Sequence, residues 1–165
     1  MTESDIVDLL LDYIADGDPS ERGFNEAALS LFSYQYERND PFRRFAQQRG
    51  RTPRTVRSWR EIPPVPISVF KDLTLSCRAP EDDWCVFMTS GTTRDGVRGR
   101  SYHPTLAVYD ASFRANFGDR FMRGNGRMRM AILFPDEAAM PNSSLAHYLA
   151  LAVGYFGTDD SRWFV

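Results

Sequence analysis

The sequence predicts an α/β protein in which a helical N-terminal third is followed by an alternating strand and helix layer. Apolar residues repeat at helical spacing up to the proline-rich stretch that begins after Ile62. Prolines at positions 63, 64 and 66 then fix extended backbone and exclude a regular helix there. After residue 84, short apolar runs alternate with helical patterns. We therefore expect a helical region with a proline-rich connector at 1–66 and a partial α/β region at 67–165.

Three helices are expected in the first region. The first helix is capped by Ser4, carries apolar residues at helical spacing and stops at Gly17. The second helix covers roughly residues 25–38. A third, short helix ends near Gly50, which is a typical C-terminal residue of a helix. A further helical turn is expected to start at Thr52, with proline in its first position.

The second region is expected to begin with a short helix that Ser68 caps and that runs to Lys71. Beyond it, β-branched and apolar runs indicate strands, and helical periodicity indicates helices. The last strand candidate stops with the chain, so the layer is expected to be incomplete. In chain order the expected elements are a strand at 84–88, a helix at 104–117, a strand at 128–134, a helix at 143–156 that Gly157 closes, and a strand that starts at 162.

The composition excludes several classes of protein. A formal net charge of -2 argues against a broad surface for nucleic acids. Two cysteines are too few for a disulfide scaffold and suit a reducing cytoplasm. The acidic start lacks the order of a signal peptide, and no apolar stretch is long enough to cross a membrane. The sequence therefore predicts a cytoplasmic protein with no nucleic-acid partner and no membrane span.

The stretch 86–101 changes abruptly from apolar residues to glycines, hydroxyl side chains and arginines. This composition suits phosphate, because glycine lets backbone N–H groups approach and Ser, Thr and Arg side chains donate hydrogen bonds. A Walker A motif is excluded, since Val97 and Arg98 stand where Lys and Ser or Thr are required. The alternative is a surface hairpin turn at 94–97, which needs Gly96 for its geometry alone.

The order Thr-Ser-Gly-Thr-Thr at 89–93 resembles the phosphate-loop signature of the adenylate-forming ligases. Arg94 stands where that signature has Gly, and no Lys follows. The stretches 31–41, 58–71 and 141–145, together with Tyr102 and His103, are similar to one branch, the acyl-protein synthetase (LuxE-type) family. The similarity extends from about Phe24 onward. It implies the N-terminal part of the large domain of an adenylate-forming ligase, with a partial nucleotide-binding region at 67–165.

The resemblance also implies an activity, which is ATP-dependent activation of a fatty or other hydrophobic carboxylate as an acyl-adenylate. The acyl group would then pass to a protein thiol, as in bacterial fatty acid reductase complexes. ATP and Mg²⁺ are the implied cofactors, a carboxylic acid such as a fatty acid is the implied substrate, and an acyl-reductase is the implied partner protein. The implied phosphate-binding residues are Thr89, Ser90, Gly91, Thr92, Thr93 and Gly96, and the implied catalytic residues are Arg98, Arg100 and His103.

Members of that family are longer than this chain, and their adenine-binding region and acyl-accepting cysteine lie beyond the equivalent of Val165. We therefore expect the chain to be the N-terminal part of such a ligase. Cys85 lies in a strand candidate and is expected to be structural, not nucleophilic. Two alternatives stay open. One is a non-catalytic module that binds a nucleotide, an acyl group or a partner protein, and the other is an acyl-CoA ligase.

The two histidines lead to different expectations. His103 follows the loop and precedes Pro104 at a helix start, so it either touches phosphate or substrate carboxylate or is only a helix-entry residue. His147 lies within a helical pattern and is expected to be partly buried, with its hydrogen bonds satisfied. Asp136 and Glu137 either face a metal or form a loop of solvated carboxylates, and we expect solvated carboxylates.

Arginines recur at near-helical steps between residues 49 and 60, with Arg49, Arg51, Arg54, Arg57 and Arg60. They either bind an anionic partner or form a solvated helix face, and the overall bias of nineteen arginines against one lysine favours the solvated face. A group of aromatic residues upstream is expected to pack in the core. Its members are Phe32, Tyr34, Tyr36, Phe42 and Phe45.

Overall fold

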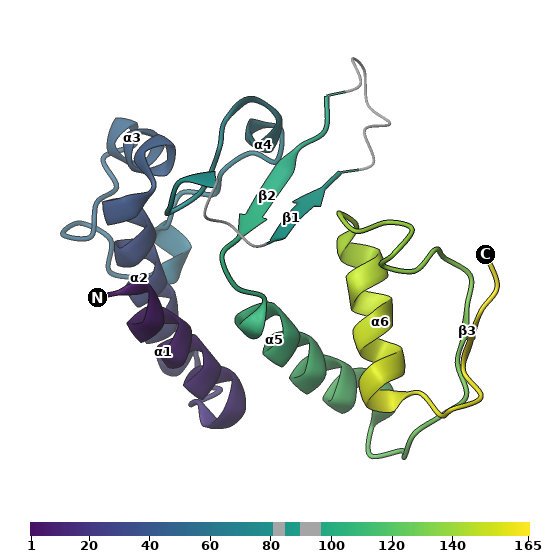
Figure 1. The fold of residues 1–165 in the computed structure, drawn as a ribbon. Coiled ribbons are helices and arrows are strands. Elements are labelled where there is room, and N and C mark those ends of the chain that lie inside the picture. The colour runs from purple at the N-terminus through teal and green to yellow at the C-terminus, as the bar shows by residue number, and fades with distance from the viewer. Residues whose placement is uncertain (81–84, 90–96) are drawn as a thin grey trace. The chain divides into compact units, whose positions relative to one another are not determined.

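The computed structural model describes residues 1–80, 85–89 and 97–165. The chain forms two compact units, Met1–Thr105 (unit 1) and Leu106–Val165 (unit 2). Each unit combines helices with a two-stranded sheet, and helices account for more residues than strands (Figure 1). The protein is therefore a mixed α/β protein, as its sequence predicts.

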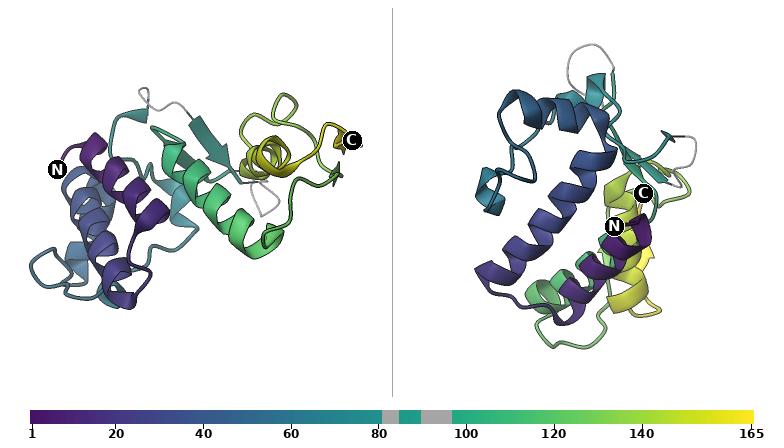
Figure 2. Two further views of the ribbon diagram at one scale, coloured as in Figure 1. Left: turned by 90° about the horizontal axis from the view of Figure 1, so that it is seen from below. Right: turned by 90° about the vertical axis from the view of Figure 1, so that its left-hand side faces the viewer.

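Unit 1 begins with three helices whose starts are set by local capping. In α1 (Glu3–Asp16) the cap is Thr2, which accepts a hydrogen bond from the Asp5 backbone while the Asp5 side chain bonds back to Thr2. The expected cap at Ser4 is therefore wrong. In α2 (Glu21–Arg38), Ser20 is the cap, and the helix starts four residues before the expected position 25. Helix α1 packs against α2 (Figure 2).

The third helix, α3 (Asp40–Gln48), starts at Asn39, whose side chain accepts a hydrogen bond from the Phe42 amide at 3.1 Å. It ends two residues before Gly50, which has a positive φ of 66° that suits glycine. The expected helical turn at Thr52 is a turn without helix. A short 3₁₀ helix, η1 (Trp59–Glu61), follows, and then come the prolines and α4 (Val69–Asp72).

The core of unit 1 lies between α2, α3 and the segment that follows α3. Its buried residues are Phe32, Phe42, Ala46 and Val56. The rings of Phe32 and Phe42 meet edge to face, with centroids 5.8 Å apart. The expected aromatic core is confirmed for these two residues, for Tyr36, which packs on the cluster, and for Tyr34, which is buried. Their packing fixes the segment that precedes the proline connector.

The sheet of unit 1 is an antiparallel hairpin of β1 (Cys85–Met88) and β2 (Arg100–His103). The first strand agrees with the expected strand over its described residues. The second strand is a correction, since residues 100–103 were expected to be loop and helix entry. Their sequence, Arg-Ser-Tyr-His, is polar and lacks an apolar alternation, so only pairing with β1 reveals the strand.

Unit 2 starts with α5 (Ala107–Phe117), which continues into a π-helical turn, η3 (Gly118–Met122). Strand β3 (Ala131–Ile132) then leads through α6 (Ser144–Phe156) to β4 (Arg162–Trp163), which pairs with β3 in parallel. The sequence offers Ser143 or Ser144 as the cap of α6, and the structure uses Ser143; Gly157 ends the helix, as the sequence predicts. Helices α5 and α6 pack against each other through aromatic rings.

The four strands lie in two separate two-stranded sheets, and no single layer joins them among the described residues, so the expected alternating layer is not formed there. The expected strand at 128–134 is reduced to two residues plus an isolated bridge at Met128. A search of the described residues for a helix with the length and apolar character of a membrane span finds none.

Candidate functional site

The hairpin of unit 1 carries the glycine- and hydroxyl-rich segment between its two strands. Thr89 and Gly99 close the paired part of the hairpin. The Thr89 amide donates to the Gly99 carbonyl at 3.0 Å, and the Gly99 amide donates to the Thr89 hydroxyl at 3.0 Å. Of the expected phosphate-binding residues, Thr89 alone is described. The other five, Ser90, Gly91, Thr92, Thr93 and Gly96, lie outside the described residues.

Side chains of the hairpin alternate between two faces, as in any strand pair. Met88 is paired with Arg100 and Val86 with Tyr102. Phe87, Ser101 and His103 belong to the opposite face, where Phe87 is buried. One face of the hairpin thus carries Arg100 with Met88 and Tyr102, and the other carries the buried Phe87 with Ser101 and His103.

A cavity of about 440 Å³ lies between this face and α4. This volume is within the range of ligand-binding pockets. Gly99 is buried beside Phe70 of α4, with an added Cβ at 3.5 Å from the Phe70 Cβ, so the hairpin and helix approach each other closely there. The residues around the cavity are Phe70, Lys71, Asp72, Leu73, Thr74, Met88, Val97, Arg98, Arg100 and Tyr102.

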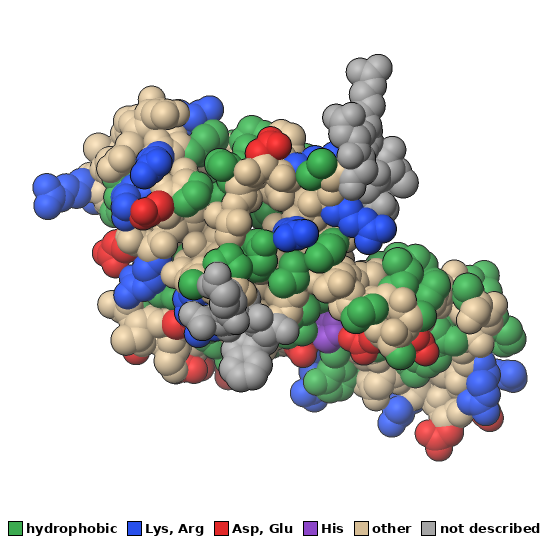
Figure 3. Space-filling view, turned by 45° about the horizontal axis from the view of Figure 1, so that its top comes forward, with side chains coloured by type: hydrophobic (Ala, Val, Ile, Leu, Met, Phe, Trp, Pro, Cys, Tyr) green, Lys and Arg blue, Asp and Glu red, His purple; other side chains and the backbone are tan. Residues whose placement is uncertain are grey.

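Among the described residues, three cations and one carboxylate line this cavity, namely Lys71, Arg98 and Arg100 against Asp72. The guanidinium groups of Arg98 and Arg100 make no hydrogen bond or ion pair with another described residue. No described residue therefore competes with a ligand for their N–H donors. Figure 3 shows Lys and Arg side chains next to hydrophobic ones on one face of the protein. The cavity therefore suits an anion with an apolar part.

The structure separates His103 from the two arginines with which the sequence grouped it. The Nε2 atom of His103 lies 3.0 Å from the Ser101 hydroxyl, and its ring centroid lies 5.0 Å from that of Phe87. His103 is not among the residues that line the cavity, whereas Arg98 and Arg100 are. Of the three expected catalytic residues, the arginines thus share one site and His103 lies on the other face of the hairpin.

Sequence reasoning missed two residues of this cavity, Lys71 and Tyr102, as functional candidates. Lys71 is the only lysine in a chain with nineteen arginines, and this could have marked it as a functional candidate. Tyr102 could have been found by extending the alternation from Arg100, had the strand been recognised. Both come to the cavity through pairing and packing that connect residues distant in sequence.

Unit 2 contains a second charged cluster, around His147 of α6. Its Nε2 atom lies 2.8 Å from Asp110 of α5, and its Nδ1 atom lies 2.6 Å from Glu137. Burial lowers the pKa of His147, but the hydrogen bonds and negative charges of Asp110 and Glu137 outweigh it, and the net pKa is raised. The expected satisfied histidine is confirmed. The expectation that Glu137 is only a solvated carboxylate is wrong, because its side chain contacts His147.

This second cluster has no geometry for metal binding. Both ring nitrogens of His147 already face carboxylates, so a protonated imidazolium satisfies the arrangement and no lone pair is left for a metal ion. Among the described residues, no group of three or more His, Cys, Asp or Glu side chains could hold a metal. The cluster therefore joins α5, the loop at 137 and α6 within unit 2.

Searches against protein-family models, curated proteins and solved structures gave no match to this chain.

Proposed function

We propose that the chain takes part in ATP-dependent activation of a fatty or other hydrophobic carboxylate, with the cavity of unit 1 binding the phosphate groups. The observation that supports this most is the convergence of Lys71, Arg98 and Arg100 on one cavity beside the hairpin. Three cations against one carboxylate match a ligand with several negative charges, such as a polyphosphate. The neighbouring hydroxyl- and glycine-rich sequence at 89–93 suits the same ligand.

The chemistry gives each cation a role. A carboxylate oxygen of the substrate attacks the α-phosphorus of ATP, the bond from that phosphorus to the bridging oxygen breaks, and pyrophosphate leaves. Negative charge grows on the pyrophosphate oxygens during this step, so cations held in place stabilise the transition state more than the ground state. Lys71, Arg98 and Arg100 would bind these oxygens.

Mg²⁺ would accompany the nucleotide and neutralise part of the phosphate charge. Mg²⁺ commonly uses one or two carboxylates together with phosphate oxygens. Asp72 is the one carboxylate among the described residues around the cavity, so it is the described residue that would hold the ion there. A single carboxylate fits an ion that is bound chiefly through phosphate oxygens.

A binding module without catalysis is the second candidate. The described lining of the cavity contains cations, one carboxylate, apolar side chains and hydroxyls but no cysteine and no histidine. Such a lining can bind an anion, and it lacks histidine, the commonest general base. Loss of the expected Gly at Arg94 favours the same alternative.

Exchange of pyrophosphate into ATP, measured in the presence of fatty acids of different chain length, distinguishes the two candidates. We expect Arg98→Gln with Arg100→Gln to lower the carboxylate-dependent exchange rate at least about 100-fold, because two cations that stabilise the leaving group are lost. The control, Arg120→Gln with Arg129→Gln, makes the same charge change outside the cavity and is expected to retain exchange. Equal rates in both variants would contradict the catalytic assignment. Nucleotide binding without any exchange would establish the binding module.

A further inference from the structure

A second concentration of positive charge lies in unit 1, in the stretch from Arg43 to Arg60. We call this stretch, residues 43–60, the arginine segment. It contains no acidic residue and no lysine, in a chain whose formal net charge is -2. Its cations are Arg43, Arg44, Arg49, Arg51, Arg54, Arg57 and Arg60.

The expected solvated helix face is wrong for most of this segment. Helix α3 ends at Gln48, and regular helix does not resume before η1 at Trp59. The turn after α3 is fixed by hydrogen bonds, with the Arg51 amide donating to the Ala46 carbonyl at 2.9 Å and the Thr55 hydroxyl donating to the Gly50 carbonyl at 3.0 Å. The arginines therefore project from a turn with defined backbone geometry.

Two anchors hold the second half of the segment. Val56 is only 2% exposed and belongs to the core of unit 1. The side chain of Asn25 in α2 accepts from the Trp59 amide at 2.7 Å and donates to the Arg57 carbonyl at 3.4 Å. The turn is thus tied to the folded body, and its arginines lose little backbone entropy when they bind a ligand.

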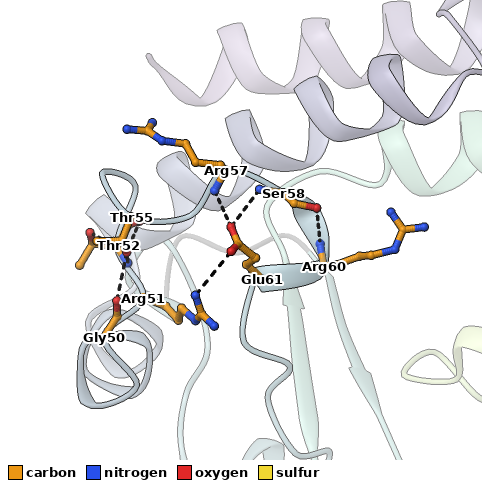
Figure 4. A network of polar contacts seen from close by, with 8 residues as sticks. All are labelled: Gly50, Arg51, Thr52, Thr55, Arg57, Ser58, Arg60 and Glu61. Atoms are coloured by element: carbon orange, nitrogen blue, oxygen red, sulfur yellow. Dashed lines mark hydrogen bonds and ion pairs between the residues drawn. The ribbon is translucent and has the colours of Figure 1, made fainter.

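Glu61 directly follows the segment in sequence and holds its backbone through hydrogen bonds. Its carboxylate accepts hydrogen bonds from the amides of Arg57, at 2.7 Å, and Ser58, at 3.1 Å, as Figure 4 shows. Hydrogen bonds from the backbone of Arg57 and then of Ser58 lower the pKa of Glu61. Its other oxygen lies 3.7 Å from Arg51. Glu61 therefore neutralises Arg51 while it fixes the backbone next to it.

The seven arginines divide into those with partners and those without. Arg43 pairs with Asp40, Arg51 with Glu61 and Arg60 with Glu21, while Arg49 lies over the ring of Phe45 at 3.7 Å. The remaining three, Arg44, Arg54 and Arg57, are exposed. Their guanidinium groups make no hydrogen bond or ion pair with another described residue. In Figure 4 the guanidinium of Arg57 points away from Glu61.

We infer that the arginine segment is an interaction surface for an acidic segment of a partner protein. Arg44, Arg54 and Arg57 present planar donor groups that match carboxylates in a bidentate way. The carboxylates of Asp40, Glu61 and Glu21 come from outside the segment, and each pairs with one of its arginines. A nucleic acid carries phosphate at every step and meets repulsion at these positions, whereas a protein segment can place neutral residues there.

The test uses fluorescence anisotropy with a fluorescein-labelled peptide in which Glu alternates with Ser, and a matched peptide in which Gln replaces Glu. We expect saturable binding of the Glu peptide alone, weakened by salt as surface charges are screened. Arg44→Gln with Arg54→Gln and Arg57→Gln is expected to lower its affinity at least about 10-fold, because charge-assisted hydrogen bonds are lost. Unchanged circular-dichroism melting shows that the variant is folded.

The matched control is Arg114→Gln with Arg120→Gln and Arg129→Gln, which changes the net charge equally at exposed positions of unit 2. It is expected to bind the Glu peptide within about 2-fold of the unmodified protein, as distant surface charges are screened. Equal losses in the two triple variants would reduce the effect to net charge and overturn the inference. Tighter binding of single-stranded DNA than of the Glu peptide would overturn the choice of a protein partner. Absence of saturable peptide binding would overturn the surface itself.

Discussion

The cavity of unit 1 and the His147 cluster of unit 2 each gather charged side chains, but the charges are paired within the protein only in the cluster. In unit 2, His147 has a carboxylate on each ring nitrogen, at 2.6 Å and 2.8 Å. In unit 1, Arg98 and Arg100 face a cavity of about 440 Å³ with no partner among the described residues. Charges that are paired inside a unit stabilise its fold, whereas charges left with unused donors are available for a ligand.

This contrast decides which cluster carries the functional proposal. A partly buried histidine with a raised pKa often marks an active site, and by that criterion the His147 cluster would be the first candidate. Its geometry argues otherwise, because both nitrogens are occupied and the described residues around it offer no metal ligand set. At the cavity, Arg98 and Arg100 have no partner among the described residues, and apolar side chains line the cavity with them.

Removal of the His147 imidazole gives the largest effect on stability that the comparison predicts. His147→Ala leaves Asp110 and Glu137 without their shared donor, and the loss of these hydrogen bonds should lower the free energy of unfolding by about 1–3 kcal/mol. Urea denaturation gives this value, and amide hydrogen exchange in α6 should accelerate. Anion binding by unit 1 should stay unchanged. A variant as stable as the unmodified protein would show that the cluster is not structural.

The pH dependence of stability gives a smaller effect with a defined sign. The folded pKa of His147 is raised, so the imidazolium stabilises the fold fully below the unfolded pKa of about 6.5, and this contribution is lost as pH rises through the folded pKa. Asp110, Glu137 and the Tyr109 ring surround His147. Urea midpoints measured from pH 5 to pH 9 should therefore fall toward the alkaline end, and His147→Gln should flatten the profile. A midpoint that rises over this range in the unmodified protein alone would contradict the assignment.

Local signals predicted the parts of the fold that depend on a few neighbouring residues. Ser143 and Gly157 mark the ends of α6 because a side-chain cap and a chain reversal are properties of adjacent residues. The first strand of the hairpin was likewise visible as an apolar run. The predicted start of α1 is wrong because Thr2 and Ser4 are equally good caps in sequence. Only Thr2 forms reciprocal hydrogen bonds with Asp5.

The features of the site that the sequence does not predict depend on pairing and packing between residues that are distant in sequence. Strand β2 is polar, so its strand character comes from pairing with β1 and not from its own composition. Lys71 reaches the cavity from α4, and Arg100 and Tyr102 reach it from β2. The arginine segment was misread as helical because near-helical steps in sequence do not reveal that Val56 is drawn into the core.

The central claim is that the cavity of unit 1 binds a polyphosphate through Lys71, Arg98 and Arg100. Titration calorimetry with inorganic triphosphate tests it most directly, since this ligand offers charge without adenine or an acyl chain. We expect saturable binding of triphosphate. Its affinity should fall at least about 100-fold in the variant Lys71→Met with Arg98→Gln and Arg100→Gln, because several charge-assisted hydrogen bonds are lost together. Arg114→Gln with Arg120→Gln and Arg129→Gln should leave the affinity unchanged. Absence of binding, or equal affinity in the two triple variants, would contradict the claim.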